Sequence, residues 1–288
     1  MKKYSFVKMS GAGNDFILFD KDSNPALALN PSVIKKLCHR RNGIGADGII
    51  TLFNSNEYNF EMEYFNADGS TGSLCGNGSR CAIKFAQLTG RIKNGRAVFI
   101  SNKKKYSGEI IDEKKIKFFL NPPEDLKLNF NIFVPGYSIN LDYINTGSPH
   151  AVIHLSGIYR SGSGKFAVFK ELDDVPVREI GSEIRYHKEF APEGTNVNFI
   201  LTDNKQVMIR TYERGVEDET LSCGTGNVAS AIIASIKYGF EPPVNLLTRG
   251  GEVLTVDFKK NGERFENISL TGPVEIIYSG EIQSTFFD

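Results

Sequence analysis

The sequence predicts an α+β fold built from two similar domains. Strand signals dominate, because most apolar stretches are short, alternate with polar residues and end at Gly, Asn, Asp or Pro. Two cysteine segments, SLCGNGSRCAIKFAQLTG and LSCGTGNVASAIIASIKYG, share one plan of cysteine, two glycines, a run of helix formers and a closing glycine. They lie about half a chain length apart, which indicates an internal duplication.

The expected strands are spread along the whole chain. They cover residues 5–9, 16–20, 48–53, 59–65, 97–101, 115–120, 151–154, 196–202, 206–212, 252–258 and 274–279. The three lysines at 103–105 fit the solvated edge of a hairpin, so they are given no function.

Helical signals are fewer. A short helix is predicted at 31–38, with Asn30 as its N-cap and a proline in its first turn. Two longer helices follow Cys75 and Cys223. The second is apolar almost all round from 228 to 236, which indicates burial, so we expect both helices to lie inside their sheets.

The similarity between the halves extends upstream of the cysteines. The segments YFNADGSTGSLCGNG and TYERGVEDETLSCGTG both read as a strand, a polar turn and then the cysteine. The proline-rich turn at 121–123 is the expected linker, so the second domain should begin near residue 120.

Composition excludes several classes of function. Lysine plus arginine and aspartate plus glutamate each number 34, so no excess of basic charge is present to bind a nucleic acid. No apolar run has the length of a signal peptide or a membrane span, so we expect a soluble, cytoplasmic protein with no membrane partner. The glycine-rich segments GIGADG and GAGND lack the rest of a dinucleotide-binding pattern.

Four cysteines are too few for a disulfide scaffold in a chain of 288 residues. No CxxC pair is present, so a metal site is not expected. Cys38 and Cys81 are expected to be core residues.

Cys75 and Cys223 are the candidate catalytic pair. A glycine-flanked turn leaves N–H groups unpaired at the start of a helix, where a thiolate or a substrate carboxylate is stabilised. Inverting a carbon centre without a cofactor needs a base on one face and an acid on the other. One such turn more often holds a buried structural cysteine, but two in the same context favour a cofactor-independent racemase or epimerase.

Together with these two cysteine segments, further motifs make the sequence resemble diaminopimelate epimerase over nearly its whole length. The motifs that carry the resemblance are KMSGAGNDF at Lys8, RNGIGADG at Arg41, FNADGS at Phe65, CGNGSRC at Cys75, PEGTNVNF at Pro192, YERGVEDETLSCGTG at Tyr212 and GGEVLTV at Gly250. The resemblance implies two similar pseudo-symmetric domains, each a mixed β-sheet or barrel wrapped around a central helix. The domains would cover 1–119 plus 274–288, and 120–273.

The resemblance also implies a reaction. The chain would interconvert LL- and meso-2,6-diaminopimelate without pyridoxal phosphate or metal, in lysine and peptidoglycan-precursor biosynthesis. Asn14, Asn66 and Asn196 would hold the distal amino and carboxylate groups of this small-molecule substrate. Arg214 would grip the distal carboxylate and Glu213 the ammonium.

The resemblance assigns further residues around the cysteines. The backbone groups that would hold the reacting carboxylate belong to Gly76, Asn77, Gly224 and Thr225. His150 would tune the cysteines. Two departures from the family pattern lie close to the site: Ser148 stands where asparagine is common, and one extra residue separates Arg214 from Cys223.

Alternatives remain at this stage. A proline or hydroxyproline racemase would also use two cysteines as acid and base, but it binds a cyclic imino acid. Glu213, Arg214 and the asparagines instead suit a substrate with a second zwitterionic end. A non-catalytic amino-acid-binding protein would use the same residues without turnover. The sequence leaves open which cysteine is the base toward the LL isomer, whether the chain forms a homodimer, and whether the cleft is open or closed.

Overall fold

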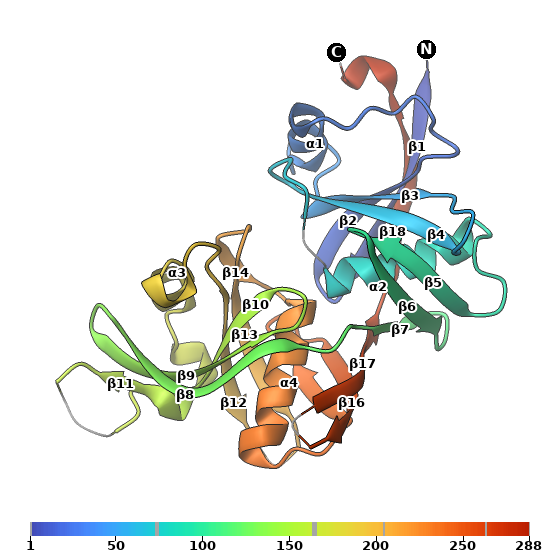
Figure 1. Cartoon of the computed structure of the whole chain (residues 1–288). Helices are drawn as coiled ribbons and strands as arrows, with labels where there is room; N and C mark the ends of the chain where they lie inside the picture. The colour runs from blue at the N-terminus through green and yellow to red at the C-terminus, as the bar shows by residue number, and fades with distance from the viewer. Residues whose placement is uncertain (1, 73–74, 163–165, 204, 263, 288) are drawn as a thin grey trace. The chain divides into compact units, whose positions relative to one another are not determined.

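The computed structural model describes residues 2–72, 75–162, 166–203, 205–262 and 264–287. It contains two compact units (Figure 1). Unit 1 comprises Met1–Phe119 and Thr271–Asp288, and unit 2 comprises Leu120–Leu270.

Unit 1 is a mixed sheet with two helices. Its elements are β1 (Lys3–Gly11), β2 (Asn14–Asp20), α1 (Pro31–Cys38), β3 (Gly48–Phe53), β4 (Phe60–Asn66), α2 (Gly76–Leu88), β5 (Arg96–Ser101), β6 (Lys104–Ile110), β7 (Lys115–Phe119) and β18 (Glu275–Gln283). β1 pairs antiparallel with β18 and β2, β2 runs parallel to β3, β3 antiparallel to β4, β4 parallel to β5, and β5 antiparallel to β6.

Unit 2 repeats this plan. Its elements are β8 (Glu124–Val134), β9 (Tyr137–Asn145), β10 (Pro149–His154), β11 (Ile158–Arg160), α3 (Val177–Arg185), β12 (Asn196–Thr202), β13 (Val207–Glu213), β14 (Asp218–Thr220), α4 (Gly224–Tyr238), β15 (Val244–Leu247), β16 (Val253–Asn261) and most of β17 (Arg264–Pro273). Antiparallel and parallel pairings alternate in the same order, through β9, β10, β12, β13, β15 and β16. The predicted α+β fold of two similar domains is confirmed.

Each unit wraps its sheet around one central helix. α2 contacts β1, β2, β3, β4, β6 and β7, while α4 contacts β9, β10, β12, β13, β15 and β16. In α4 every residue from 224 to 234 is buried, as its apolar composition predicts. Among the described residues, no helix combines the length and the apolar character needed to cross a membrane.

Local sequence signals predicted the bounds of several elements correctly. α1 covers residues 31–38, and the Asn30 side chain accepts a hydrogen bond of 2.9 Å from the Val33 backbone N–H, so the predicted N-cap is confirmed. β3 and β12 have the predicted bounds.

Other elements were not predicted from the sequence: β6, β8, β9, β11, β14, β15, β17 and α3. α3 was missed because Gly181 lowers helix propensity at its centre. The structure explains this glycine, since a Cβ there would lie 2.6 Å from the Cβ of Tyr212. β8 was missed although apolar residues recur at alternate positions from Leu126 to Val134, and most of this strand is exposed in the structure.

The burial of α4 yields a stability prediction. Ile232 is fully buried, so Ile232→Ala should lower the free energy of unfolding by about 2–5 kcal/mol through lost burial and a residual cavity. Ile111 is 49% exposed, and Ile111→Ala should change it by no more than about 0.5 kcal/mol. Urea denaturation of the two variants measures the difference. An unchanged midpoint for Ile232→Ala would contradict the central position of α4.

Candidate functional site

Both candidate cysteines occupy the N-cap of a central helix. Cys75 precedes α2 with φ −112° and ψ 112°, and Cys223 precedes α4 with φ −110° and ψ 114°. The Gly78 backbone N–H donates to the Cys75 sulfur at 3.3 Å. Each sulfur therefore sits at the positive end of a helix dipole, where negative charge is stabilised. Cys75 is partly exposed and Cys223 is buried.

A glycine in the first turn of each helix allows a strand to approach closely. A Cβ at Gly78 would lie 3.1 Å from Ile50 Cδ1 of β3, and a Cβ at Gly226 would lie 2.4 Å from Asn198 Oδ1 of β12. Ile50 and Asn198 thus hold equivalent positions in the two units. The backbone plan is shared, but an apolar side chain faces one helix start and a polar side chain faces the other.

In unit 1 a chain of buried polar side chains orients the start of α2. Arg80 Nη2 donates to Asn77 Oδ1 at 2.9 Å, and Asn77 Nδ2 donates to Asn14 Oδ1 at 2.6 Å. Asn14 Nδ2 in turn donates to Asp47 Oδ2 at 3.1 Å. Two of the predicted substrate residues, Asn14 and Asn77, are therefore brought together with their amide orientations fixed.

Arg80 is a buried cation in this half of the molecule. Its side chain has no solvent exposure. Burial lowers the pKa of its guanidinium to about 10, and interactions with Cys81 and Cys75 oppose that shift. Arg80 stays charged at neutral pH, so it supplies a permanent positive charge near Cys75. Arg80 was not predicted as a site residue from the sequence, although it lies within the CGNGSRC motif.

Asn66 lies at the end of β4. Its side chain is partly exposed and donates to Ser70 Oγ at 3.0 Å. Gly76 is the first residue of α2 and contributes only backbone groups.

In unit 2 a different network surrounds the start of α4. His150 Nε2 lies 2.9 Å from Thr225 Oγ1 and 3.0 Å from Ser148 Oγ. Thr225 Oγ1 lies 3.6 Å from Cys223 Sγ. On its other side, His150 Nδ1 lies 3.1 Å from Asn198 Nδ2. The structure thus brings Ser148, His150 and Thr225 together beside Cys223.

His150 is neutral at physiological pH. Its side chain is completely buried, and burial together with the positive charge of Arg214 lowers its pKa to about 3. A neutral imidazole has one donor and one acceptor nitrogen. His150 therefore acts as a directional hydrogen-bonding group rather than as a source of charge.

Asn196 and Arg214 are joined across β12 and β13. Asn196 Oδ1 accepts from the Arg214 backbone N–H at 2.9 Å, and Asn196 Nδ2 donates to the Pro149 carbonyl at 2.8 Å. The Arg214 guanidinium lies 3.5 Å from the Glu193 carboxylate. At the end of β13, Glu213 Oε2 accepts from Thr220 Oγ1 at 2.7 Å. Both charged side chains therefore have polar partners within the protein.

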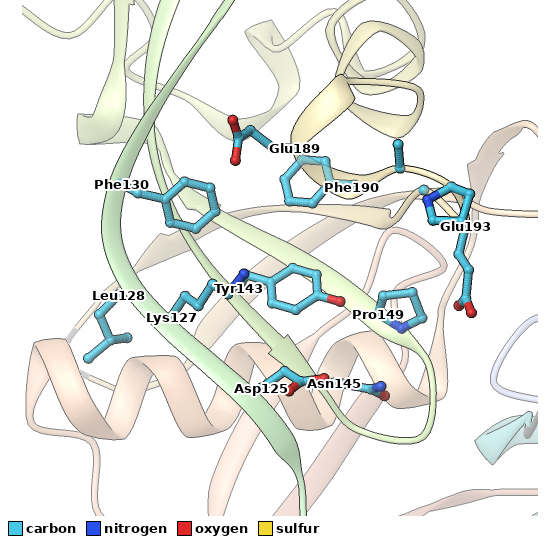
Figure 2. A pocket seen from close by; sticks show the side chains of 13 residues that line it. Asp125, Lys127, Leu128, Phe130, Tyr143, Asn145, Pro149, Glu189, Phe190 and Glu193 are labelled. Atoms are coloured by element: carbon cyan, nitrogen blue, oxygen red, sulfur yellow. The ribbon is translucent and has the colours of Figure 1, made fainter.

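A pocket of about 640 Å³ lies beside this group in unit 2 (Figure 2). Tyr143 stacks on Phe190 with ring centroids 5.7 Å apart, and its hydroxyl points toward Pro149. Pro149 and Glu193 line the pocket and also contact Asn196 and Arg214. None of the predicted site residues lines it.

Asn198 and Thr211 are further polar residues that the sequence analysis missed. They form a cross-strand pair on β12 and β13, and both are buried. A signal was present, because Asn196 and Asn198 are two residues apart and side chains at that spacing point to the same face of a strand. Within the described residues, no group of three His, Cys, Asp or Glu side chains is arranged to hold a metal.

Solved structures share this architecture at low sequence identity. A hydroxyproline epimerase from Agrobacterium vitis matches with a TM-score of 0.69 and 15% identity, covering 97% of this chain and 92% of that one. A probable proline racemase from Agrobacterium radiobacter K84 matches with a TM-score of 0.70 and 14% identity, covering 99% and 94%. These likenesses concern the fold alone.

Sequence relatives are closer. The diaminopimelate epimerase from Chlorobaculum tepidum is 39% identical over 278 residues, covering 95% of this chain and 99% of that one. The diaminopimelate epimerase from Aquifex aeolicus is 38% identical over 289 residues, covering 96% and 97%. The family profile for diaminopimelate epimerase matches residues 6–118 and 143–277. The chain belongs to the diaminopimelate epimerase family.

Proposed function

We propose that this protein interconverts LL- and meso-2,6-diaminopimelate without a cofactor, in lysine and peptidoglycan-precursor biosynthesis. The observation that carries the proposal is the repeated arrangement of the two cysteines, each the N-cap of a buried helix with nearly the same backbone angles. Curated relatives that match almost the whole chain bear the name diaminopimelate epimerase.

In the proposed mechanism, Cys75 and Cys223 exchange roles as base and acid. The thiolate of one removes the α-proton, and the thiol of the other delivers a proton to the opposite face of the same carbon. The product leaves with the configuration inverted and with the thiol and thiolate exchanged between the two cysteines. Reversing the reaction starts from that state.

The intermediate needs stabilisation of its enolate-like carboxylate. We assign this role to the backbone N–H groups of Gly76, Asn77, Gly224 and Thr225, which open the two helices. Such groups are pre-oriented donors, so little reorganisation is needed when negative charge develops.

Recognition of the distal end is assigned to charged and polar side chains. Arg214 would bind the distal carboxylate and Glu213 the distal ammonium. Asn14, Asn66 and Asn196 would complete the polar environment. Because the amides of Asn14 and Asn196 are already held by protein groups, their remaining hydrogen-bonding positions point in fixed directions.

The proposal also places the protein in the cytoplasm, acting on a small molecule. Both proposed catalytic groups must be reduced to work, and all four cysteines are present as thiols. The epimerase domains we assign are those predicted from the sequence, 1–119 plus 274–288 and 120–273.

A homodimer is proposed on the basis of β18. This strand pairs with β1, and it exposes Ile276, Ile277 and Tyr278. An exposed apolar edge strand favours pairing with another chain unless it is covered. We propose that β18 of a second copy covers it.

Removing either catalytic sulfur should abolish most activity. We expect Cys75→Ala and Cys223→Ala each to lower kcat/KM by at least roughly 10²–10⁴-fold, because one face of the carbon then has no acid or base. Cys38→Ala is the control, since Cys38 belongs to a core cluster of unit 1. Steady-state assays measure the effect. Near-normal turnover by either variant would exclude the two-cysteine mechanism.

Substrate choice is tested by α-proton exchange in D2O. We expect deuterium at one α-carbon of LL- and meso-diaminopimelate, very little in the DD isomer, and none in lysine or proline. Unpaired polar groups in the distal site should cost about 1–3 kcal/mol each with a substrate lacking the distal groups. Mass spectrometry and NMR measure the incorporation. Rapid exchange into proline with diaminopimelate inert would favour the proline racemase alternative.

The proposed dimer is tested by placing a charge on its surface. Ile277 is 52% exposed, and Ile277→Lys should shift the particle from two chain masses to one in analytical ultracentrifugation. Phe133→Lys changes a residue that is 72% exposed on β8 and should leave the mass unchanged. A wild-type protein that sediments as a monomer would overturn the dimer.

A further inference from the structure

A row of buried polar side chains lies behind Cys223. Asn198 and His150 have no solvent exposure, and Thr211, Thr225 and Ser148 are at most 6% exposed. Burying polar groups is costly unless they are hydrogen-bonded, so the pairing within this row should be well defined.

The orientation of Asn198 is fixed by its neighbours. Its Nδ2 lies 3.1 Å from the carbonyl oxygen of Ala151, which can only accept, so the atom at that position is the amide nitrogen. Its Oδ1 accepts from Thr211 Oγ1 at 3.0 Å. A flipped amide would place two oxygens against each other at the Ala151 carbonyl.

This orientation determines the tautomer of His150. The same Nδ2 lies 3.1 Å from His150 Nδ1, so Nδ1 must accept and carries no proton. A neutral imidazole then carries its proton on Nε2. Arg214 is the charged group that acts on His150, and its positive charge adds to burial in keeping the ring neutral.

The proton on Nε2 points toward two hydroxyls. Nε2 lies 2.9 Å from Thr225 Oγ1 and 3.0 Å from Ser148 Oγ, which itself lies 3.2 Å from Thr225 Oγ1. Asn196 Nδ2 donates to Ser148 at 3.4 Å and His150 Nε2 bears a proton, so among these partners we assign Thr225 Oγ1 as the acceptor of the Ser148 hydroxyl proton. In this assignment both His150 and Ser148 donate to Thr225 Oγ1, whose own proton is then directed toward Cys223 Sγ, 3.6 Å away.

A sulfur that accepts this hydrogen bond is stabilised as a thiolate. A protonated thiol would have to donate to Thr225 Oγ1, which already accepts hydrogen bonds from His150 and Ser148. Unit 1 is built differently at the equivalent positions. Ile50 replaces Asn198 and has no hydrogen-bonding group in its side chain, and Asn77 replaces Thr225. Cys75 is therefore an internal reference in the same molecule.

We propose that Asn198 is a positioning residue, which holds His150 as the Nε2–H tautomer and so directs the Thr225 hydroxyl to stabilise the Cys223 thiolate. The effect of Asn198 on catalysis rests on the proposed function. No proton passes along the row, because the proton that Cys223 takes from the substrate stays on sulfur until it is returned. The tautomer and the thiol reactivity are measurable without turnover.

The first experiment reverses the tautomer with Asn198→Asp. A carboxylate accepts from Nδ1–H, so Nε2 would become the acceptor and Thr225 would donate to it instead of to Cys223. At neutral pH we expect alkylation of Cys223 by iodoacetamide to slow about tenfold, equivalent to about one pKa unit. The rate at Cys75, read from the same sample by peptide mass spectrometry, should not change.

The negative charge that Asn198→Asp introduces would also slow Cys223, so a double-mutant cycle separates the two effects. Thr225→Val removes only the hydroxyl and should slow alkylation of Cys223 by itself, whereas Thr225→Ser should restore it. If Asn198 acts through Thr225, Asn198→Asp should add little when combined with Thr225→Val. An undiminished effect in the double variant would overturn the proposal in favour of simple charge repulsion.

The tautomer is read directly from ¹⁵N NMR of the four histidines, with His150 assigned by its loss in His150→Gln. Wild type should show Nε2–H, and Asn198→Asp should show Nδ1–H or the imidazolium. An Nδ1–H tautomer in wild type would overturn the proposal even if no variant folds. If these results hold while D2O exchange into diaminopimelate fails, only the proposed function is wrong.

Discussion

The unpaired N–H groups at the start of a buried helix are the constraint on which each unit depends. Four donors at a helix N-terminus must find acceptors, and inside a sheet water cannot supply them all. Each helix has a cysteine at its N-cap and a glycine in its first turn, which lets a strand approach closely, and in unit 1 the Gly78 N–H donates to the Cys75 sulfur. The same donors favour an anion, so the start of each helix suits the carboxylate and thiolate chemistry that we propose.

The two units keep this backbone arrangement and differ in the side chains beneath it. In unit 1 the fixed charge of Arg80 lies near Cys75. In unit 2 a neutral His150 is held in a network of amide and hydroxyl groups beside Cys223. In the proposed mechanism the two cysteines exchange roles, so both sulfurs need support as thiolates. Unit 1 offers that support through the charge of Arg80 and the N–H of Gly78, and unit 2 offers it through the side chains around Thr225.

The sequence predicted the parts of the structure that have local causes. Three features depend only on residues that are close together in the sequence, so they could be predicted from it. They are the N-cap Asn30, the two cysteine turns and the apolar helix α4. Partners that depend on strand pairing were missed. Asn198 meets His150 because β12 runs parallel to β10, and that pairing cannot be read from either segment alone.

Ser148 shows how a departure from the family pattern acquires a physical meaning. From the sequence it bears on substrate recognition, because it replaces a common asparagine. In the structure its hydroxyl lies within hydrogen-bonding distance of His150, Thr225 and Asn196. A serine hydroxyl both donates and accepts, whereas an amide divides these roles between two atoms in fixed directions. In the proposed assignment the substitution therefore acts first on the hydrogen bonds that join Thr225 to Cys223, and on the proposed distal site only through Asn196.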